Sequence, residues 1–324
     1  MLYPFVFEPV FKDRVWGGRE LERLYAKKLP AGQRIGEAWE ISDRPGDASV
    51  IVNGELAGKD LHWLMENHGA EVLGGAHPAA EGRFPLLCKI LDARDKLSLQ
   101  VHPPADQAAA LKGEPKTEMW YIADAAPDAS LYVGLKQGVT RAEFEKKIAD
   151  GSVADCFQRL PVRAGDAMFL PSGRVHAIGS GLVIFEIQQN SDTTYRVFDW
   201  NRVGLDGKPR ALHIAQSLAS INFNDFEPKL VGTKFSGKGK IQKRVLVDDP
   251  LFKVEAWKTD ADASGLLKAK KLQIVAVTAG AAEIKSGSTQ VNLAAGQFCL
   301  VPASLDRTQV VAKAGTALLR VEAN

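Results

Sequence analysis

The sequence predicts a mainly β protein made of two related β-domains, with a few short helices added to them. Short strand-like runs dominate the 324 residues, and Gly, Pro and Asp turns separate them, which is typical of β-sandwiches and barrels. One supersecondary pattern also occurs twice, first from Ala164 and again from Ala295. Helical periodicity is confined to a few short segments, so we expect only a few short helices.

The expected strands are apolar or alternating runs bounded by turn residues. In the first two thirds of the chain they occupy residues 38–43, 84–93, 117–125, 129–135, 167–171 and 181–191. In the last third they occupy residues 252–260, 272–280, 281–287, 289–296 and 317–323. Their close spacing is the main evidence for the fold class.

The helical segments are short, and their ends carry ordinary helix signals. They are residues 58–69, 104–113, 140–151 and 211–223. Thr140 and Glu143 have capping-box spacing, which predicts a helix start at that point. In the last segment Leu212, Ala215 and Leu218 recur along one side, so we expect an amphipathic helix with that side buried.

The segment 229–244 is basic and contains glycines, which predicts an exposed linker or a hairpin at a domain edge. Beyond it the chain is almost pure strand pattern. We therefore place a domain boundary near residue 229. A domain of residues 1–228 would carry the helices, and a second β-domain would span residues 229–324.

The repeat relates the two predicted domains and also distinguishes them. Both copies run Ala-Gly, two residues, an apolar triplet, Pro, a loop and a late strand, with Pro171 aligned to Pro302. Five residues later the first copy has His176 and the second has Arg307. We expect the second domain to lack metal ligands and to have a structural role.

Composition limits the partners and the compartment. A net charge of +2 gives no reason to expect nucleic acid or a membrane surface as a partner. No apolar run approaches 18 residues, and the N-terminus lacks a basic start and a cleavage site, which predicts a cytoplasmic protein. Cys88, Cys156 and Cys299 lie far apart in apolar stretches, so we expect small buried hydrophobes rather than a disulfide or zinc framework.

The run "SLQVHPP", residues 98–104, places polar side chains in what should be a core strand. Ser98, Gln100 and His102 alternate with apolar residues, so they share one face of the strand. Burying each of them without a partner would cost roughly 1–3 kcal/mol. We therefore expect something on that face to compensate them.

The first copy of the repeat carries a fixed spacing: Gly165, five residues, Pro171, one residue, Gly173, two residues, His176. This spacing resembles the second signature of the cupin fold, a double-stranded β-helix. The glycines permit tight turns and the proline closes a strand, which would aim the histidine into the barrel. The fold class we expect is therefore two cupin-type jelly-roll domains.

The polar residues of the run 98–104 then have candidate partners elsewhere in the chain. Gln100, His102, Glu118 and His176 would bring an amide oxygen, two imidazoles and a carboxylate together. This set suits one zinc ion per chain, or another first-row divalent ion, with one or two positions left open. The residual formal charge of about +1 beside an open position would stabilise a developing oxyanion.

Longer motifs indicate which family of cupins the chain resembles. They read "EPVFKDRVWGGREL", "IGEAWEISD", "LSLQVHPPADQA", "GEPKTEMWYI" and "FLPSGRVHAIGSGLVIFEIQQNSDTTYRVFDWNR". Together they resemble type I mannose-6-phosphate isomerase in its short bacterial form, over nearly the whole chain and most strongly over residues 84–202. The resemblance implies zinc on the four ligands named above. It also places the family's active-site arginine on Arg196 and a motif lysine on Lys116.

The resemblance implies interconversion of mannose 6-phosphate and fructose 6-phosphate through a cis-enediol. Arg196 is a poor base, because its pKa exceeds about 12, so we expect it to stabilise the enediolate or bind phosphate. Lys116 shares a strand face with Glu118 and could relay a proton if burial near the metal lowers its pKa. Asp192 is a rival base, and Glu186 is expected at the pocket.

The substrate is expected to be a small phosphosugar, and the substrate-binding candidates are Ser98, Lys89 and Asp192. Ser98 lies on the ligand face, and Lys89 is a lysine within an apolar strand. Alternatives stay open at this point. They are a cupin dioxygenase with non-haem iron, an isomerase of an unphosphorylated aldose, and a sugar-binding cupin without activity. The chain is expected to be a monomer or a homodimer.

Overall fold

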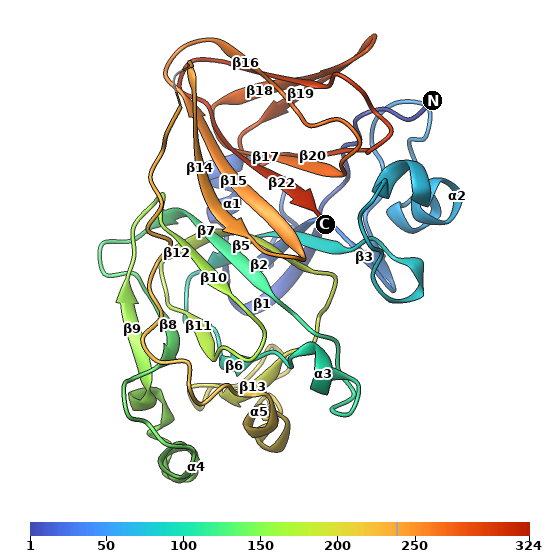
Figure 1. The fold of residues 1–324 in the computed structure, drawn as a ribbon. Helices are drawn as coiled ribbons and strands as arrows, with labels where there is room; N and C mark the ends of the chain where they lie inside the picture. Colours follow the sequence, from blue (N-terminus) through green and yellow to red (C-terminus); the bar gives the residue numbers. More distant parts are fainter. Residues whose placement is uncertain (238) are drawn as a thin grey trace.

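The structure, a computed structural model, describes residues 1–237 and 239–324 and confirms the mainly β architecture with two jelly-roll barrels (Figure 1). In the first barrel the larger sheet has the order β1-β2-β5-β12-β7-β10 and the smaller one the order β13-β6-β11-β8-β9. The larger sheet comprises β1 (Val10–Gly18), β2 (Ile35–Ile41), β5 (Leu86–Ala93), β12 (Leu182–Gln189), β7 (Glu118–Ala125) and β10 (Ala167–Leu170). The smaller sheet comprises β13 (Tyr195–Phe198), β6 (Leu99–Val101), β11 (His176–Ile178), β8 (Ser130–Leu135) and β9 (Phe157–Pro161).

The second barrel repeats the core of the first. Its sheets have the orders β14-β15-β22-β17-β20 and β16-β21-β18-β19. The strands are β14 (Ile241–Asp248), β15 (Phe252–Thr259), β16 (Ala263–Leu266), β17 (Gln273–Ala279), β18 (Ala281–Ser286), β19 (Thr289–Ala294), β20 (Phe298–Val301), β21 (Gln309–Ala312) and β22 (Ala317–Ala323). The rows β5-β12-β7-β10 and β6-β11-β8-β9 thus recur as β15-β22-β17-β20 and β16-β21-β18-β19, which confirms the internal repeat. A small hairpin joins β3 (Asp43–Arg44) to β4 (Asp47–Ala48).

The helices are short, and most of them lie at the periphery of the barrels (Figure 1). They are α1 (Glu20–Tyr25), α2 (Leu61–Leu73), α3 (Ala105–Ala108), α4 (Arg141–Asp150) and α5 (Ile214–Ser220), with 3₁₀ turns at η1 (Ala80–Gly82) and η2 (Val153–Cys156). The predicted cap of α4 is confirmed, because the Thr140 hydroxyl accepts from the Glu143 N–H at 3.2 Å. No helix within the described residues is long and apolar enough to cross a membrane.

Two helix predictions are wrong in detail. Helix α2 continues past Gly69 to Leu73, with a non-helical residue at His68, because its last turn still buries apolar side chains. On α5 the predicted apolar side is buried only in part, since Leu218 packs half-buried against the core but Ala215 is exposed. Leu212 precedes the helix and is exposed, whereas the buried residues of α5 are serines. Helix α5 packs on β13, and small side chains permit that close approach.

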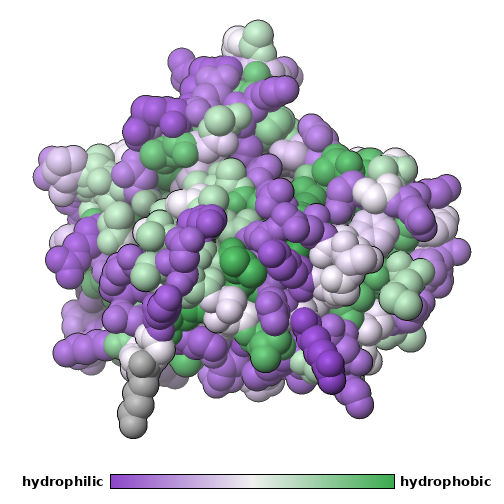
Figure 2. Space-filling model, turned by 90° about the horizontal axis from the view of Figure 1, so that it is seen from above, coloured by the Kyte–Doolittle hydropathy of each residue, from purple (hydrophilic) through white to green (hydrophobic). Residues whose placement is uncertain are grey.

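The segment predicted as a linker or edge hairpin contains a short hairpin. Ser236 and Lys243 exchange both backbone hydrogen bonds at 2.8 Å, and β14 continues from there as the edge strand beside β15. Lys238, within the same segment, lies outside the described residues. On the face shown in Figure 2, hydrophilic side chains surround small apolar patches.

The larger sheets of the two barrels share one hydrophobic core. Phe185 of β12 stacks on Phe298 of β20 with ring centroids 5.5 Å apart. The N-terminal segment also crosses over, since Phe5 and Leu300 exchange backbone hydrogen bonds of 2.8 and 2.9 Å. The domain boundary near residue 229 therefore stays a prediction, because the core between the larger sheets includes residues from both sides of it. All three cysteines are free and buried, as expected.

Candidate metal and substrate site

The alternating polar residues of β6 face the interior of the first barrel. β6 lies between β13 and β11, and Gln100 is directly opposite Arg196 on one side and His176 on the other. The Ser98 hydroxyl lies 3.2 Å from the Gln100 side-chain oxygen, and both residues line one cavity. The sheet register thus brings three polar side chains into a row that no single motif predicts.

A cluster of buried metal-binding residue types lies between the two sheets. His102 and His176 come from the smaller sheet side, and Glu118 begins β7 of the larger sheet. Their candidate ligand atoms all lie within 4.8 Å of one another. His102 Nε2 is 3.2 Å from Glu118 Oε1, and His176 Nε2 is 3.7 Å from Glu118 Oε2. The turn at Gly173, with φ of 88°, directs the chain into the strand that carries His176.

The backbone fixes the orientation of both imidazoles. His102 Nδ1 lies 2.8 Å from the carbonyl of Thr193, and His176 Nδ1 lies 3.0 Å from the carbonyl of Arg174. A carbonyl oxygen only accepts, so each Nδ1 carries the proton and each Nε2 keeps its lone pair. Both lone pairs therefore point toward the cluster, as a metal ligand requires.

The charge states of the cluster also fit a metal. Burial and the Lys116 ammonium lower the pKa of His102 to about 3, and burial lowers the pKa of His176. Burial alone would raise the pKa of Glu118, but Lys116 and His102 hold that pKa well below its usual range. Two neutral imidazoles and one carboxylate result at neutral pH.

Several polar atoms of the cluster lack a hydrogen bond. Among the described residues, His102 Nε2 and Glu118 Oε2 are buried without a hydrogen-bond partner. Lys116 Nζ lies 2.7 Å from Glu118 Oε1, which is an ion pair, but it leaves the second oxygen free. Native proteins rarely leave such atoms unsatisfied, so the donor set fits a cation at this position.

Gln100 lies beside the cluster, but it presents its amide nitrogen to it rather than the predicted oxygen. Its side-chain nitrogen lies 3.2 Å from His176 Nε2, and its oxygen accepts from Ser98. The two ends of an amide are assigned from the hydrogen-bond network. Turning the amide would direct its oxygen to the cluster, and the Ser98 hydroxyl can accept from the amide nitrogen instead.

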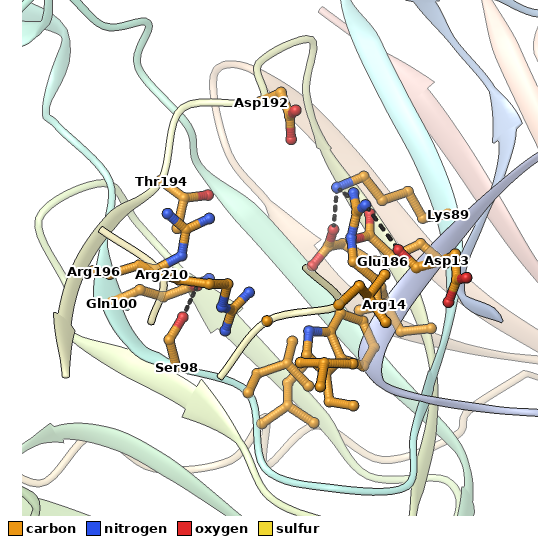
Figure 3. Close-up of a pocket in the computed structure, with 18 of the residues that line it drawn as sticks. Asp13, Arg14, Lys89, Ser98, Gln100, Glu186, Asp192, Thr194, Arg196 and Arg210 are labelled. Atoms are coloured by element: carbon orange, nitrogen blue, oxygen red, sulfur yellow. Dashed lines mark hydrogen bonds and ion pairs between the residues drawn. The ribbon is translucent and has the colours of Figure 1, made fainter. Parts of the chain in front are cut away.

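A cavity of about 470 Å³ opens above this cluster. The smaller sheet presents Ser98, Gln100 and Arg196 to it, and the larger sheet presents Lys89 and Glu186 (Figure 3). The predicted residues that line it are Lys89, Ser98, Gln100, Lys116, Glu186, Asp192 and Arg196. The other predicted residues, His102, Glu118 and His176, are 1–2% exposed and lie beneath Gln100 and Lys116.

The cavity wall contributed by the larger sheet is a row of alternating charges. Arg14 Nε donates to Glu37 at 2.7 Å, Lys89 Nζ lies 3.5 Å from Glu37, and it lies 3.2 Å from Glu186. Burial lowers the pKa of Lys89, but the two carboxylates outweigh it and raise that pKa. The Trp120 indole also donates to Glu186 at 2.7 Å. Lys89 thus faces the cavity already enclosed by two carboxylates.

Sequence reasoning missed some of the cavity residues. They are Arg14, Glu37, Thr194 and Arg210. A signal for Glu37 was available, since it alternates with Trp39 in an apolar run, as Lys89 does in its own strand. Nothing in the local pattern distinguishes Arg14 or Arg210 from a surface arginine.

Arg196 differs from the other cations of the cavity. Arg14, Lys89, Lys116 and Arg210 each have an acidic partner. In the part of the chain that the structure describes, Arg196 has none, and its Nε is buried without a hydrogen bond. Burial and the nearby Arg210 lower the pKa of Arg196. The cavity therefore contains one uncompensated guanidinium.

Comparison with known proteins identifies the family. Residues 5–135 match the model of the phosphomannose isomerase type I catalytic domain. The chain is 36% identical to the mannose-6-phosphate isomerase of Streptococcus mutans, over 95% of each chain. It shares 30% identity and a TM-score of 0.89 with the crystal structure of the mannose 6-phosphate isomerase from Bacillus subtilis, covering 99% of each chain. A zinc-bound mannose 6-phosphate isomerase shares the fold, with a TM-score of 0.75 at 18% identity.

These likenesses extend over both barrels, and the sequence motifs, the buried cluster and the cavity above it all lie within them. The chain belongs to the type I mannose-6-phosphate isomerase family.

Proposed function

We propose that this protein is a metal-dependent aldose–ketose isomerase that interconverts mannose 6-phosphate and fructose 6-phosphate through a cis-enediol. Family membership supports the reaction class. The observation that carries the proposal is a buried His-Glu-His cluster with unsatisfied atoms, beneath a cavity that contains an uncompensated guanidinium. An open-chain phosphosugar complements both parts of this site: its vicinal oxygens at C1 and C2 suit a metal at the cluster, and its phosphate at C6 suits the guanidinium.

Gln100, His102, Glu118 and His176 would hold the metal. Two imidazoles, a carboxylate and an amide oxygen suit zinc, and zinc is the ion in the zinc-bound isomerase that shares this fold. A divalent ion bound there would polarise the oxygens at C1 and C2 of the sugar. The backbone carbonyls behind both imidazoles keep the ligands in place when the sugar changes shape.

Arg196 is the group best suited to the substrate's negative charge. Within the described residues it forms no ion pair, and a guanidinium binds a phosphate or an enediolate through two parallel hydrogen bonds. Ser98 lines the same cavity and can add a donor. Lys89 is less available than the sequence implied, because Glu37 and Glu186 already hold its ammonium.

The proton between C1 and C2 requires a base within the cavity. Lys116 is one candidate, because it lines the cavity and its Nζ lies 2.7 Å from Glu118 Oε1. Lys116 would take the proton from one carbon and return it to the other. Asp192 is the rival, because its carboxylate lines the same cavity (Figure 3).

The test is an isomerase assay on mannose 6-phosphate that detects fructose 6-phosphate. Protein stripped with EDTA should be inactive, and added zinc should restore activity. Activity that persists without metal would refute the metal dependence. A metal-loaded protein that leaves mannose 6-phosphate unchanged would refute the substrate, and oxygen uptake or turnover of free aldoses would then indicate the alternatives.

A further inference from the structure

His213 does not line the cavity, but it forms hydrogen bonds with both the backbone N–H and the backbone carbonyl of Arg196. The His213 N–H donates to the Arg196 carbonyl at 2.8 Å. The Arg196 N–H in turn donates to His213 Nδ1 at 3.2 Å. Arg196 of β13 and His213, which precedes α5, are thus joined by two hydrogen bonds that close a ring.

The position of β13 explains why Arg196 needs such a partner. β13 is the edge strand of the smaller sheet, with β6 on one side only. Arg196 is directly opposite Gln100, yet its own N–H and C=O go to His213, so the two residues form a non-hydrogen-bonded pair. In such pairs the backbone groups point away from the neighbouring strand and the side chains approach most closely. His213 therefore takes the place of a missing neighbouring strand.

The contact with His213 is tied to a regular element. The His213 carbonyl accepts from the Ser217 N–H at 2.8 Å, which is the first turn of α5. The imidazole also packs against Tyr195, with ring centroids 6.0 Å apart. Helix α5 lies beside β13 (Figure 1), and it thus supports the imidazole that accepts from the Arg196 N–H.

We propose that His213 is a positioning residue for Arg196: its ring nitrogen and its backbone hold the Arg196 peptide so that the guanidinium points into the cavity. The kinetic consequence rests on the proposed function, because it requires Arg196 to act on the substrate. Nδ1 has to accept, so the imidazole works in its neutral form. Burial and the charge of Arg196 lower the pKa of His213, which agrees with that requirement.

The experiment compares two substitutions in two backgrounds. His213→Ala removes the acceptor, whereas His213→Asn keeps one at the same distance from Cβ. We expect His213→Ala to lower kcat/KM for mannose 6-phosphate about tenfold, as small misplacements of a substrate-binding group do. His213→Asn should recover most of that loss. In an Arg196→Ala background, His213→Ala should cause no further loss, because the two residues act as one unit. His68→Ala, on α2, is the matched control.

Two kinetic outcomes would overturn the proposal: an equal loss in both backgrounds, or His213→Asn as impaired as His213→Ala. Hydrogen exchange at the Arg196 amide gives an answer that does not depend on activity. Faster exchange in His213→Ala supports the proposal, and unchanged exchange overturns it. A wild-type protein inactive on mannose 6-phosphate would refute the proposed function, and the exchange measurement would still decide the role of His213.

Discussion

At the scale of single residues, the site is defined by which atoms have partners and which do not. In both candidate histidines Nδ1 donates to a backbone carbonyl, so only Nε2 is available to the cluster. Glu118 is 1% exposed, and among the described residues its Oε2 has no hydrogen bond. Arg196 repeats this pattern in the cavity, because in the described part of the chain it forms no ion pair and its Nε has no hydrogen bond. These unsatisfied groups are costly to fold and are best explained by a ligand.

Replacing Glu118 by Gln should remove the only negative charge of the proposed ligand set. We expect metal affinity to fall by more than the roughly 100-fold that changes behind metal ligands cause, and isomerase activity to be lost with it. Metal content measured after dialysis, together with the assay, tests this. Glu66→Gln on the exposed side of α2 is the control. A Glu118→Gln protein that keeps its metal would contradict the ligand assignment.

Replacing Arg196 by Gln separates its two possible roles. Loss of a hydrogen bond to a charged group costs about 1.5–3 kcal/mol, which corresponds to about 10- to 100-fold. If Arg196 binds the phosphate, KM for mannose 6-phosphate should rise by that factor. If it stabilises the enediolate, kcat should fall instead. Steady-state kinetics distinguish these results, and unchanged values of both constants would exclude Arg196 from the site.

At the scale of elements, register across a sheet assembles the cavity wall. Trp39, Lys89, Glu186 and Trp120 are directly opposite one another on β2, β5, β12 and β7. Glu37 lies two residues from Trp39 on the same face and completes the alternation of charge with Lys89. Removing one partner of such a buried pair is strongly destabilising, because the other charge is left buried without compensation. The row keeps Lys89 rigid at the cavity.

The row predicts a specific acid sensitivity. Burial opposes the charge of Glu37, but Lys89 and Arg14 outweigh burial and lower the pKa of Glu37 from 4.5 to about 2. A lowered carboxylate pKa stabilises the fold above the unfolded pKa, and that stability is lost as the pH falls from 4.5 towards 2. The loss should be about 3 kcal/mol.

Urea unfolding at pH values from about 6 to about 2 would measure this contribution. Glu37→Gln should be less stable than wild type at neutral pH and should lose less stability on acidification. Glu66→Gln, with an exposed side chain, should follow the wild-type curve. If Glu37→Gln and wild type lose stability in parallel, the charge row is not the cause.

Helix α4 offers a prediction that separates stability from activity. Thr140→Ala removes the acceptor for the Glu143 N–H and should destabilise the protein by about 1 kcal/mol. Thr140→Ser keeps the oxygen and should cost much less. Because no residue of α4 lines the cavity, kcat and KM should stay at wild-type values in both variants. Altered kinetics in Thr140→Ala would mean that α4 affects the site.

At the scale of the whole molecule, the two barrels are one structural unit. Their larger sheets enclose a common core, and the N-terminal segment pairs with the second barrel through Phe5 and Leu300. The second barrel repeats the strand order of the first, but Arg307 stands at the repeat position of His176. Its contribution to the site is therefore indirect: it covers the outer face of the sheet whose inner face carries Lys89 and Glu186.

Phe298→Ala tests this coupling from the second barrel. The side chain is 3% exposed and stacks on Phe185, so its loss should cost about 3–5 kcal/mol. Because the core is shared, scanning calorimetry should show one transition that shifts to a lower temperature as a whole. Two separate transitions, with only one of them shifted, would show that the barrels unfold independently.

The sequence by itself determined the features that local chemistry encodes. Strand alternation placed Ser98, Gln100 and His102 on one face, and the Gly-Pro-Gly-His spacing located His176. The repeat predicted two related β-domains, because one supersecondary pattern occurs twice in the chain. Lys89 in an apolar strand also indicated a pocket residue, although its two carboxylate partners come from other strands.

Only the tertiary structure decided what stands opposite each of these residues. Arg14, Glu37 and Arg210 reach the cavity because β1, β2 and the segment after β13 happen to border it. His213 contacts Arg196 because α5 folds back against an edge strand, where two backbone groups needed partners. Periodicity specifies the face on which a side chain lies, but the neighbour on that face depends on sheet order and register, which are set by contacts between distant parts of the chain.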